Sequence, residues 1–159
     1  ISMGYKNFDF SMFWQGSGRS SFWINPGSIT PFVDTDGGDG KTGRNALMKV
    51  IADNHWSEDN RDIHAFWPRL ANSVIGNNTQ TSTWWMRNGT FLRLKNVELG
   101  YTLPDKWTKK AHMSLVRLYL SGSNLLCFSN FKLWDPEMAG NGLGYPVQRV
   151  FNLGINVSF

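Results

Sequence analysis

The sequence predicts an all-β fold, an antiparallel transmembrane β-barrel, and three observations support this prediction. Residues 149–159 alternate between apolar and polar or small side chains, a pattern that places the two kinds on opposite faces of a strand. The strand-like segments are joined by connections that are long, short and long, as loops and turns alternate in outer-membrane barrels. No stretch approaches about 18 consecutive apolar residues, so a transmembrane helix is not expected.

The terminal strand, about 149–159, has the clearest pattern. From Phe151 on, its odd positions are apolar, whereas its even positions are polar or small. A soluble sheet seldom ends its chain on such a strand, but in a barrel the apolar face meets lipid and the polar face meets a wet lumen. The residues predicted to face lipid here are Phe151, Leu153, Ile155 and Val157.

Three further strands are predicted at about 5–16, 90–103 and 114–124. Each is long enough for a tilted span of about 9–11 residues. Their predicted lipid-facing residues are Phe8, Phe10, Met12, Val97, Leu99, Val116, Leu118 and Leu120. The first and second strands each contain an irregularity. Phe13 interrupts the alternation, and Arg93 and Lys95 would lie on the apolar face unless that half projects beyond the lipid or a bulge near Lys95 shifts the phase.

The connections fix a topology for the whole chain, residues 1–159. Two segments, at about 17–89 and 125–148, are predicted to be extracellular loops, and the segment at about 104–113 is predicted to be a periplasmic turn. Residues 45–55 have apolar side chains at helical spacing, which favours a short amphipathic helix within the first loop. The chain begins with Ile1 rather than Met, and we interpret it as a piece of a longer protein.

Composition and motifs exclude several function classes. The net charge of +4 comes with only one local basic cluster, at 106–112, so nucleic-acid binding is not expected. The three histidines and Cys127 lack metal-ligand spacing, so no metal or cofactor is expected. The aspartates within 34–39 resemble a calcium loop only faintly, because no terminal glutamate follows at the right distance. Since no catalytic motif is present, the chain is not expected to be an enzyme.

Several strings together resemble the C-terminal end of SusC/RagA-type TonB-dependent outer-membrane transporters. They lie in order across nearly the whole chain, and their combination is highly specific. The strings are WPRL at 67–70, the Trp84–Trp85 pair, FLRLKNVELGYTLP at 91–104, VRLYLSGSNL at 116–125, WDPE at 134–137 and YPVQRVFNLGINVSF at 145–159.

The resemblance implies a plugged barrel of about 22 strands, of which this chain would be the last four. It implies a bacterial outer-membrane location and import of oligosaccharides or peptides. The implied partners are TonB, through a part of the protein absent here, a SusD-like surface lipoprotein, outer-membrane lipid and the barrel-assembly machinery. Phe159 would be the terminal aromatic that this machinery reads, or a plain aromatic at the membrane interface.

Candidate ligand contacts lie in the predicted loops. Trp134, Asp135 and Glu137 offer an aromatic platform and two acceptors for a sugar or peptide, although loop packing is the favoured interpretation. Trp23 and Phe32, which lie outside the matched strings, are the more open candidates for contact with ligand or with the SusD-like lid protein. Packing of loop against loop is likewise favoured for the remaining loop tryptophans, Trp56, Trp67, Trp84 and Trp85.

Charged residues also lie on the predicted strands. Arg93, Lys95, Arg117 and Arg149 either contact the lumen contents or pair across strands with Asp9 or Glu98. A soluble all-β carbohydrate-binding module is the alternative function. It agrees less well with the pattern, because four strands with one apolar face leave a soluble sheet half uncovered.

Overall fold

The computed structural model describes residues 1–32 and 45–159. The chain forms two compact units. The first, which we call the sheet unit, contains residues 1–20, 88–137 and 145–159. The second, the loop unit, contains residues 21–87 and 138–144, described except for 33–44.

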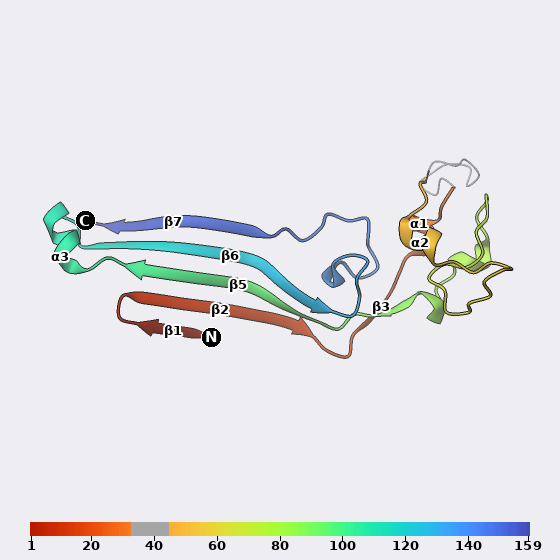
Figure 1. Cartoon of the computed structure of the whole chain (residues 1–159), viewed down its shortest axis with the longest axis horizontal. Helices are drawn as coiled ribbons and strands as arrows, with labels where there is room; N and C mark the ends of the chain where they lie inside the picture. Colours follow the sequence, from red (N-terminus) through yellow and green to blue (C-terminus); the bar gives the residue numbers. More distant parts are fainter. Residues whose placement is uncertain (33–44) are drawn as a thin grey trace. The chain divides into compact units, whose positions relative to one another are not determined.

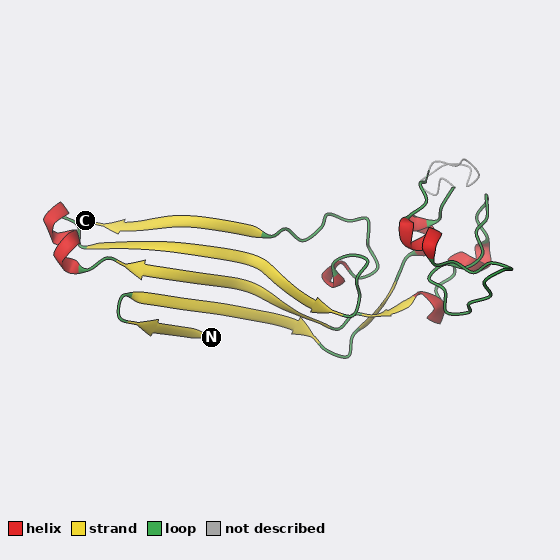
Figure 2. Ribbon diagram, in the orientation of Figure 1, coloured by secondary structure: helices red, strands yellow, loops and turns green. Residues whose placement is uncertain are grey.

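The sheet unit is one antiparallel sheet whose strands pair in chain order (Figure 1). Its long strands are tied by short helical or turn connections at one end and by longer loops at the other (Figure 2). Its five strands are β1 (Ser2–Tyr5), β2 (Phe8–Ser17), β5 (Phe91–Thr102), β6 (Leu115–Ser129) and β7 (Val150–Ser158).

The start of the sheet differs from the four-strand prediction. The strand predicted over about 5–16 corresponds to β2, and the structure adds β1 before it, which pairs with β2 around the two residues Lys6 and Asn7. Lys6 adopts a left-handed φ of 52°, which non-glycine residues seldom occupy. Because the turn carries no Gly, its sequence gave no hairpin signal.

A β-bulge at Lys95 keeps the apolar face continuous. Against β2, Phe13 pairs with Asn96 and Trp14 pairs with Leu94, so Lys95 is the extra residue of β5. Against β6, Asn96 pairs with Ser123 and Leu94 pairs with Leu126, so two residues of β6 lie opposite Lys95. The bulge shifts the side-chain phase and puts Arg93 on the polar face. The bulge interpretation of the irregular pattern is therefore confirmed, and Phe13 lies beside the same irregularity.

One face of the sheet is apolar and open. Partners in register share a face, as in the row Phe10, Leu99, Leu120 and Leu153. Leu153 is 83% exposed and Ile155 is 58% exposed, so neither belongs to an internal core. Val116, near the end of β6 that contacts α3, is buried instead.

The connection between β5 and β6 is helical. It contains α3 (Asp105–Thr108) and the 3-10 helix η3 (Lys109–Ala111), and ends with His112 at a left-handed φ of 56°. Figure 1 shows α3 at the same end of the sheet as the β1–β2 turn and the C-terminus. No helix among residues 1–32 and 45–159 combines the length and apolar character needed to cross a membrane.

The loop unit has a small aromatic core of its own. Its elements are β3 (Ser21–Trp23), α1 (Pro26–Ile29), α2 (Lys49–Asp53), η1 (Gly76–Thr79), η2 (Thr83–Trp85) and β4 (Met86–Asn88), with β3 and β4 paired. The predicted helix within 45–55 is present as α2, shorter than expected, and buries Ile51. Trp67 and Trp85 are buried with ring centroids 5.1 Å apart.

Candidate functional site

Arg117 organises an ion cluster on the polar face of the sheet. Its Nε donates to Asp9 Oδ2 at 3.0 Å, and its Nη2 donates to Glu98 Oε1 at 2.6 Å. A second bond joins Nη2 to Asp9 Oδ1. The three side chains come from three adjacent strands, β6, β2 and β5, so the cluster ties these strands together. Cross-strand pairing of Arg117 with both predicted acids is therefore confirmed.

Two glycines leave room for this cluster. At Gly100, between Asp9 and Tyr119 in register, a Cβ would overlap the Arg117 guanidinium and the Asp9 carboxylate. At Gly154 a Cβ would overlap the Tyr119 ring. The Arg117 guanidinium carbon also lies 5.4 Å from the centroid of that ring, within reach of a cation–π contact. The polar face is thus packed by large side chains lying over glycines.

A second ion cluster joins β5 to the loop after β6. Arg93 Nη2 lies 2.5 Å from Asp135 Oδ1, and Arg93 Nε lies 2.6 Å from Glu137 Oε2. Lys95 Nζ lies 3.4 Å from Glu137 Oε1. Arg93 is almost fully buried, with its side chain 3% exposed. Both acids of the WDPE string are thus held by cations of this chain, an arrangement that fixes the loop onto the strand.

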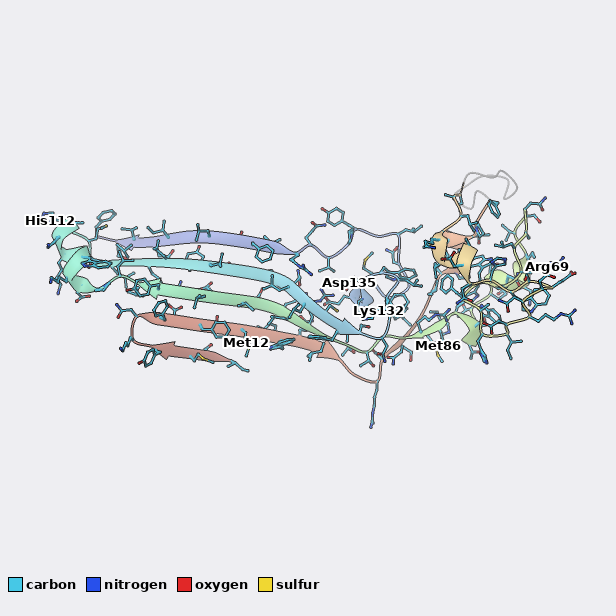
Figure 3. The ribbon with its side chains drawn as sticks, viewed as in Figure 1. Met12, Arg69, Met86, His112, Lys132 and Asp135 are labelled. Atoms are coloured by element: carbon cyan, nitrogen blue, oxygen red, sulfur yellow. The ribbon has the colours of Figure 1, made fainter. Side chains whose placement is uncertain are left out.

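The turn around these acids is also defined locally. The Glu137 N–H donates to Asp135 Oδ1 at 3.0 Å, and the 3-10 helix η4 runs over Pro136–Met138. Trp134 packs edge-on against Phe131, with ring centroids 4.9 Å apart. Figure 3 shows Asp135 and Lys132 in the loop beyond the end of β6. Trp134, Asp135 and Glu137 therefore all have contacts within the sheet unit.

The other predicted residues are spread over both units. Trp23 is half exposed on β3, and Phe159 is 92% exposed at the end of the chain. Phe32 is partly exposed, with a left-handed φ of 65°. Arg149 is exposed just before β7. The aspartates that faintly resembled a calcium loop lie within 33–44, outside the described residues.

The loop unit contains an open cavity of about 400 Å³. Trp84, Phe66, His64 and Arg87 contribute to its lining. Arg87 donates from Nη1 to the Trp84 carbonyl at 2.7 Å, and its guanidinium carbon lies 5.4 Å from the Phe66 ring centroid. Burial lowers the pKa of Arg87. Packing is confirmed for Trp67 and Trp85, which are buried, whereas Trp84 lines this open cavity.

Sequence reasoning missed the contacts of Arg93 and Lys95. The sequence predicts that they pair with acids on neighbouring strands. In the structure they pair with Asp135 and Glu137, each 42 residues later in the chain. One signal was present, because both the two cations and the two acids are spaced two residues apart. The space-making roles of Gly100 and Gly154 were missed too, since a glycine in a strand does not show what lies over it.

Comparisons with known proteins agree over nearly the whole chain. No family model matches it. It is 30% identical over 169 residues to TonB-dependent receptor P3 of Formosa agariphila, covering 98% of this chain and 15% of that receptor. It is 26% identical over 160 residues to the TonB-dependent receptor SusC of Bacteroides thetaiotaomicron, covering 99% of this chain and 14% of SusC.

A solved structure gives the same result. The RagAB peptide importer in its open-open state superposes with a TM-score of 0.69 at 26% identity, covering 98% of this chain and 16% of the matched chain. The chain thus spans about 15% of the length of the receptors that it matches. Its antiparallel sheet corresponds to part of their barrel, and these receptors are outer-membrane proteins. The chain belongs to the SusC/RagA-type TonB-dependent receptors of the outer membrane.

Proposed function

We propose that this chain is the C-terminal barrel segment of a TonB-dependent importer of oligosaccharides or peptides. One observation carries the proposal: a single sheet has an exposed apolar face and a polar face crossed by ion pairs. Such a sheet suits lipid on one side and a wet lumen on the other. The soluble carbohydrate-binding module has no comparable support, because the related receptors lie in the outer membrane.

The proposed orientation places α3 and the chain end at the periplasmic side. The loop unit and the loop after β6 then lie at the extracellular side, where cargo arrives. In this orientation the lipid-facing set is the predicted one without Val116, which is buried. Above the bulge, Trp14 and Leu126 extend it on either side of the buried Leu94, with which both pair in register.

The partners of the whole receptor follow from its relatives. SusC and RagAB support a SusD-like lipoprotein that meets the extracellular side and a TonB contact in a part of the protein outside this chain. A peptide importer among the related structures supports peptide cargo, and oligosaccharides are the second class that the family resemblance implies. We assign no catalytic role to any residue of this chain.

The candidate cargo contacts divide into two groups. Asp135 and Glu137 are neutralised by Arg93 and Lys95, so we infer that the WDPE string holds the loop in place and that Trp134 packs within it. Trp23 keeps an exposed ring, which suits stacking on a sugar or a peptide side chain. It is the remaining cargo candidate of the predicted set.

Growth of a deletion strain tests the proposal. The gene of the full-length receptor is removed, and growth is measured on single oligosaccharides or on peptides as the limiting nutrient. We expect growth to fail on one nutrient class, to return with the intact gene, and to stay absent when TonB is also deleted. Normal growth of the deletion strain on every nutrient tested, or rescue without TonB, contradicts the proposal.

A further inference from the structure

An open groove lies at the end of the β5–β6 pair. It has a volume of about 420 Å³ and is lined by residues from the start of β5, the end of β6 and the loop that follows β6, among them Leu92, Phe128, Asn130 and Lys132. Leu92 and Phe128 pair in register and share the apolar face. They are 48% and 58% exposed, so the groove has an apolar floor that the described residues leave uncovered.

The floor is held in place from the side. The Phe128 ring stacks on Trp14 of β2, with ring centroids 6.3 Å apart. At the last residue of β6, the Ser129 hydroxyl donates to the Thr90 carbonyl at 3.0 Å and accepts from the Phe131 N–H at 3.1 Å. These bonds fix the point at which the chain leaves β6. The groove is therefore built on regular strands rather than on a loop alone.

Lys132 supplies a cation at the rim. Its side chain is exposed, and the ion pairs of residues 1–32 and 45–159 do not include it. The acids nearest to it in the sequence, Asp135 and Glu137, are already paired with Arg93 and Lys95. The positive charge is therefore left for a partner outside the described chain, and Asn130 adds an exposed amide beside it.

We propose that this groove binds a phosphorylated glycolipid of the outer leaflet, with an acyl chain on Leu92 and Phe128 and a phosphate on Lys132. The occupant follows from charge complementarity and from position. An apolar floor next to lipid with a lysine at its upper rim matches a molecule that is apolar below and anionic above. The inference depends on the proposed lipid-facing side of the sheet, but not on which cargo the receptor imports.

Native mass spectrometry of the full-length receptor in detergent tests the site, with purified lipid A as the probe. We expect the wild-type receptor to retain lipid A, and Lys132→Glu to lower the retained fraction roughly tenfold, the loss of one charge-assisted bond. Lys132→Arg should bind like the wild type. Dephosphorylated lipid A should bind the wild type roughly tenfold more weakly, and inorganic phosphate should not compete.

Arg19 provides the matched control. It is an exposed cation at the turn after β2 and does not line the groove. Arg19→Glu should retain lipid A within about twofold of the wild type, as expected for a general surface charge. Equal loss in both variants, unchanged binding by Lys132→Glu, or equal binding of dephosphorylated lipid overturns the proposal. Because growth on the imported nutrient is measured separately, failure of import leaves this result interpretable.

Discussion

Tyr119 and Arg117 occupy space that two glycines leave open on the polar face. The Tyr119 ring lies over Gly154, and the Arg117 guanidinium lies over Gly100. In both contacts the glycine and the large side chain lie on neighbouring strands. A larger residue in place of the glycine would therefore collide with the side chain of the next strand. Packing of this kind makes the polar face of the sheet sensitive to single added methyl groups.

Gly154→Val is expected to destabilise the full-length receptor by about 1–3 kcal/mol, because the new side chain overlaps the Tyr119 ring. The measurement is the temperature at which the folded form disappears in heat-modifiability gels. Gly4→Val is the matched control, since the nearest atom to a Cβ there is the Phe8 carbonyl oxygen at 3.8 Å. Adding Tyr119→Ser should restore much of the loss, and a Gly154→Val barrel as stable as the control would contradict this account.

Arg93→Met is expected to release the loop that contains WDPE. The substitution leaves Asp135 and Glu137 without their buried cation and should lower the stability of the loop by about 2 kcal/mol. This value lies below the range for fully buried ion pairs because both acids are partly exposed. Amide exchange in 133–138 should therefore rise more than tenfold. Lys49→Ala breaks an exposed pair with Asp53 and should change exchange little. Unchanged protection in 133–138 would show that the loop is held by other contacts.

At the scale of single residues, the sequence predicted contacts between neighbours better than contacts at a distance. Asp9 and Glu98 were the acids expected to pair with the charged residues of the strands, and Arg117 pairs with both. Period-two alternation puts these three side chains on one face of adjoining strands. The partners of Arg93 lie in an irregular loop, where no period relates sequence to space. Opposite charge alone could not choose among the acids of the chain.

The bulge at Lys95 is the element that lets β5 keep both its charges and its apolar face. Without the extra residue, Arg93 would lie on the same face as Val97 and Leu99. The sequence allowed two explanations for these charges, a strand end that projects beyond the lipid or a bulge near Lys95. The structure has the bulge. The β1–β2 hairpin was missed although the apolar residues change from odd positions up to Tyr5 to even positions from Phe8. The two polar residues between them, Lys6 and Asn7, form a turn without Gly.

Deletion of Lys95 tests the bulge. The phase of β5 above it should reverse and put Arg93 on the lipid side, where a central charge costs about 2–4 kcal/mol and one near the interface less. We expect the amount of receptor in isolated outer membranes to fall severalfold, as judged by immunoblot. Deletion of the exposed Gln80 in the loop unit is the control and should leave the amount unchanged. Equal amounts of both receptors would mean that β5 slips to a new register.

Leu153 and Asn152 offer a test of the two faces within one strand. Leu153→Arg puts a charge on the proposed lipid face and should lower outer-membrane abundance strongly, because the cost is about 2–4 kcal/mol near the bilayer midplane. Asn152→Arg, its neighbour on the polar face, should be tolerated. If Asn152→Arg is the more damaging variant in the same immunoblot, the assignment of the faces is reversed.

At the scale of the whole molecule, β7 forms one edge of the sheet and ends one residue before Phe159. The Ser114 N–H donates to the Ser158 carbonyl at 2.8 Å, which holds the strand in register up to its last residues. The Phe159 side chain projects almost fully exposed beyond this point. We propose that this exposed aromatic ring contacts the barrel-assembly machinery.

Phe159→Asp is expected to reduce the outer-membrane abundance of the full-length receptor severalfold and to increase its degraded or periplasmic fraction. The physical reason is loss of an exposed apolar ring, which contributes about 1.5–3 kcal/mol on burial against a partner. Tyr145→Asp changes an equally open aromatic outside the strands and serves as the control. Equal abundance of both variants would show that Phe159 has no part in assembly.

The two ends of the segment between β2 and β5 leave the sheet side by side. Ser17 pairs with Phe91, and the Gly89 N–H donates to the Ser20 carbonyl at 2.8 Å. Whatever length of chain lies between them, the two strands beneath are already aligned by their own ladder. The segment can therefore change in length and sequence without moving the strands on which it stands.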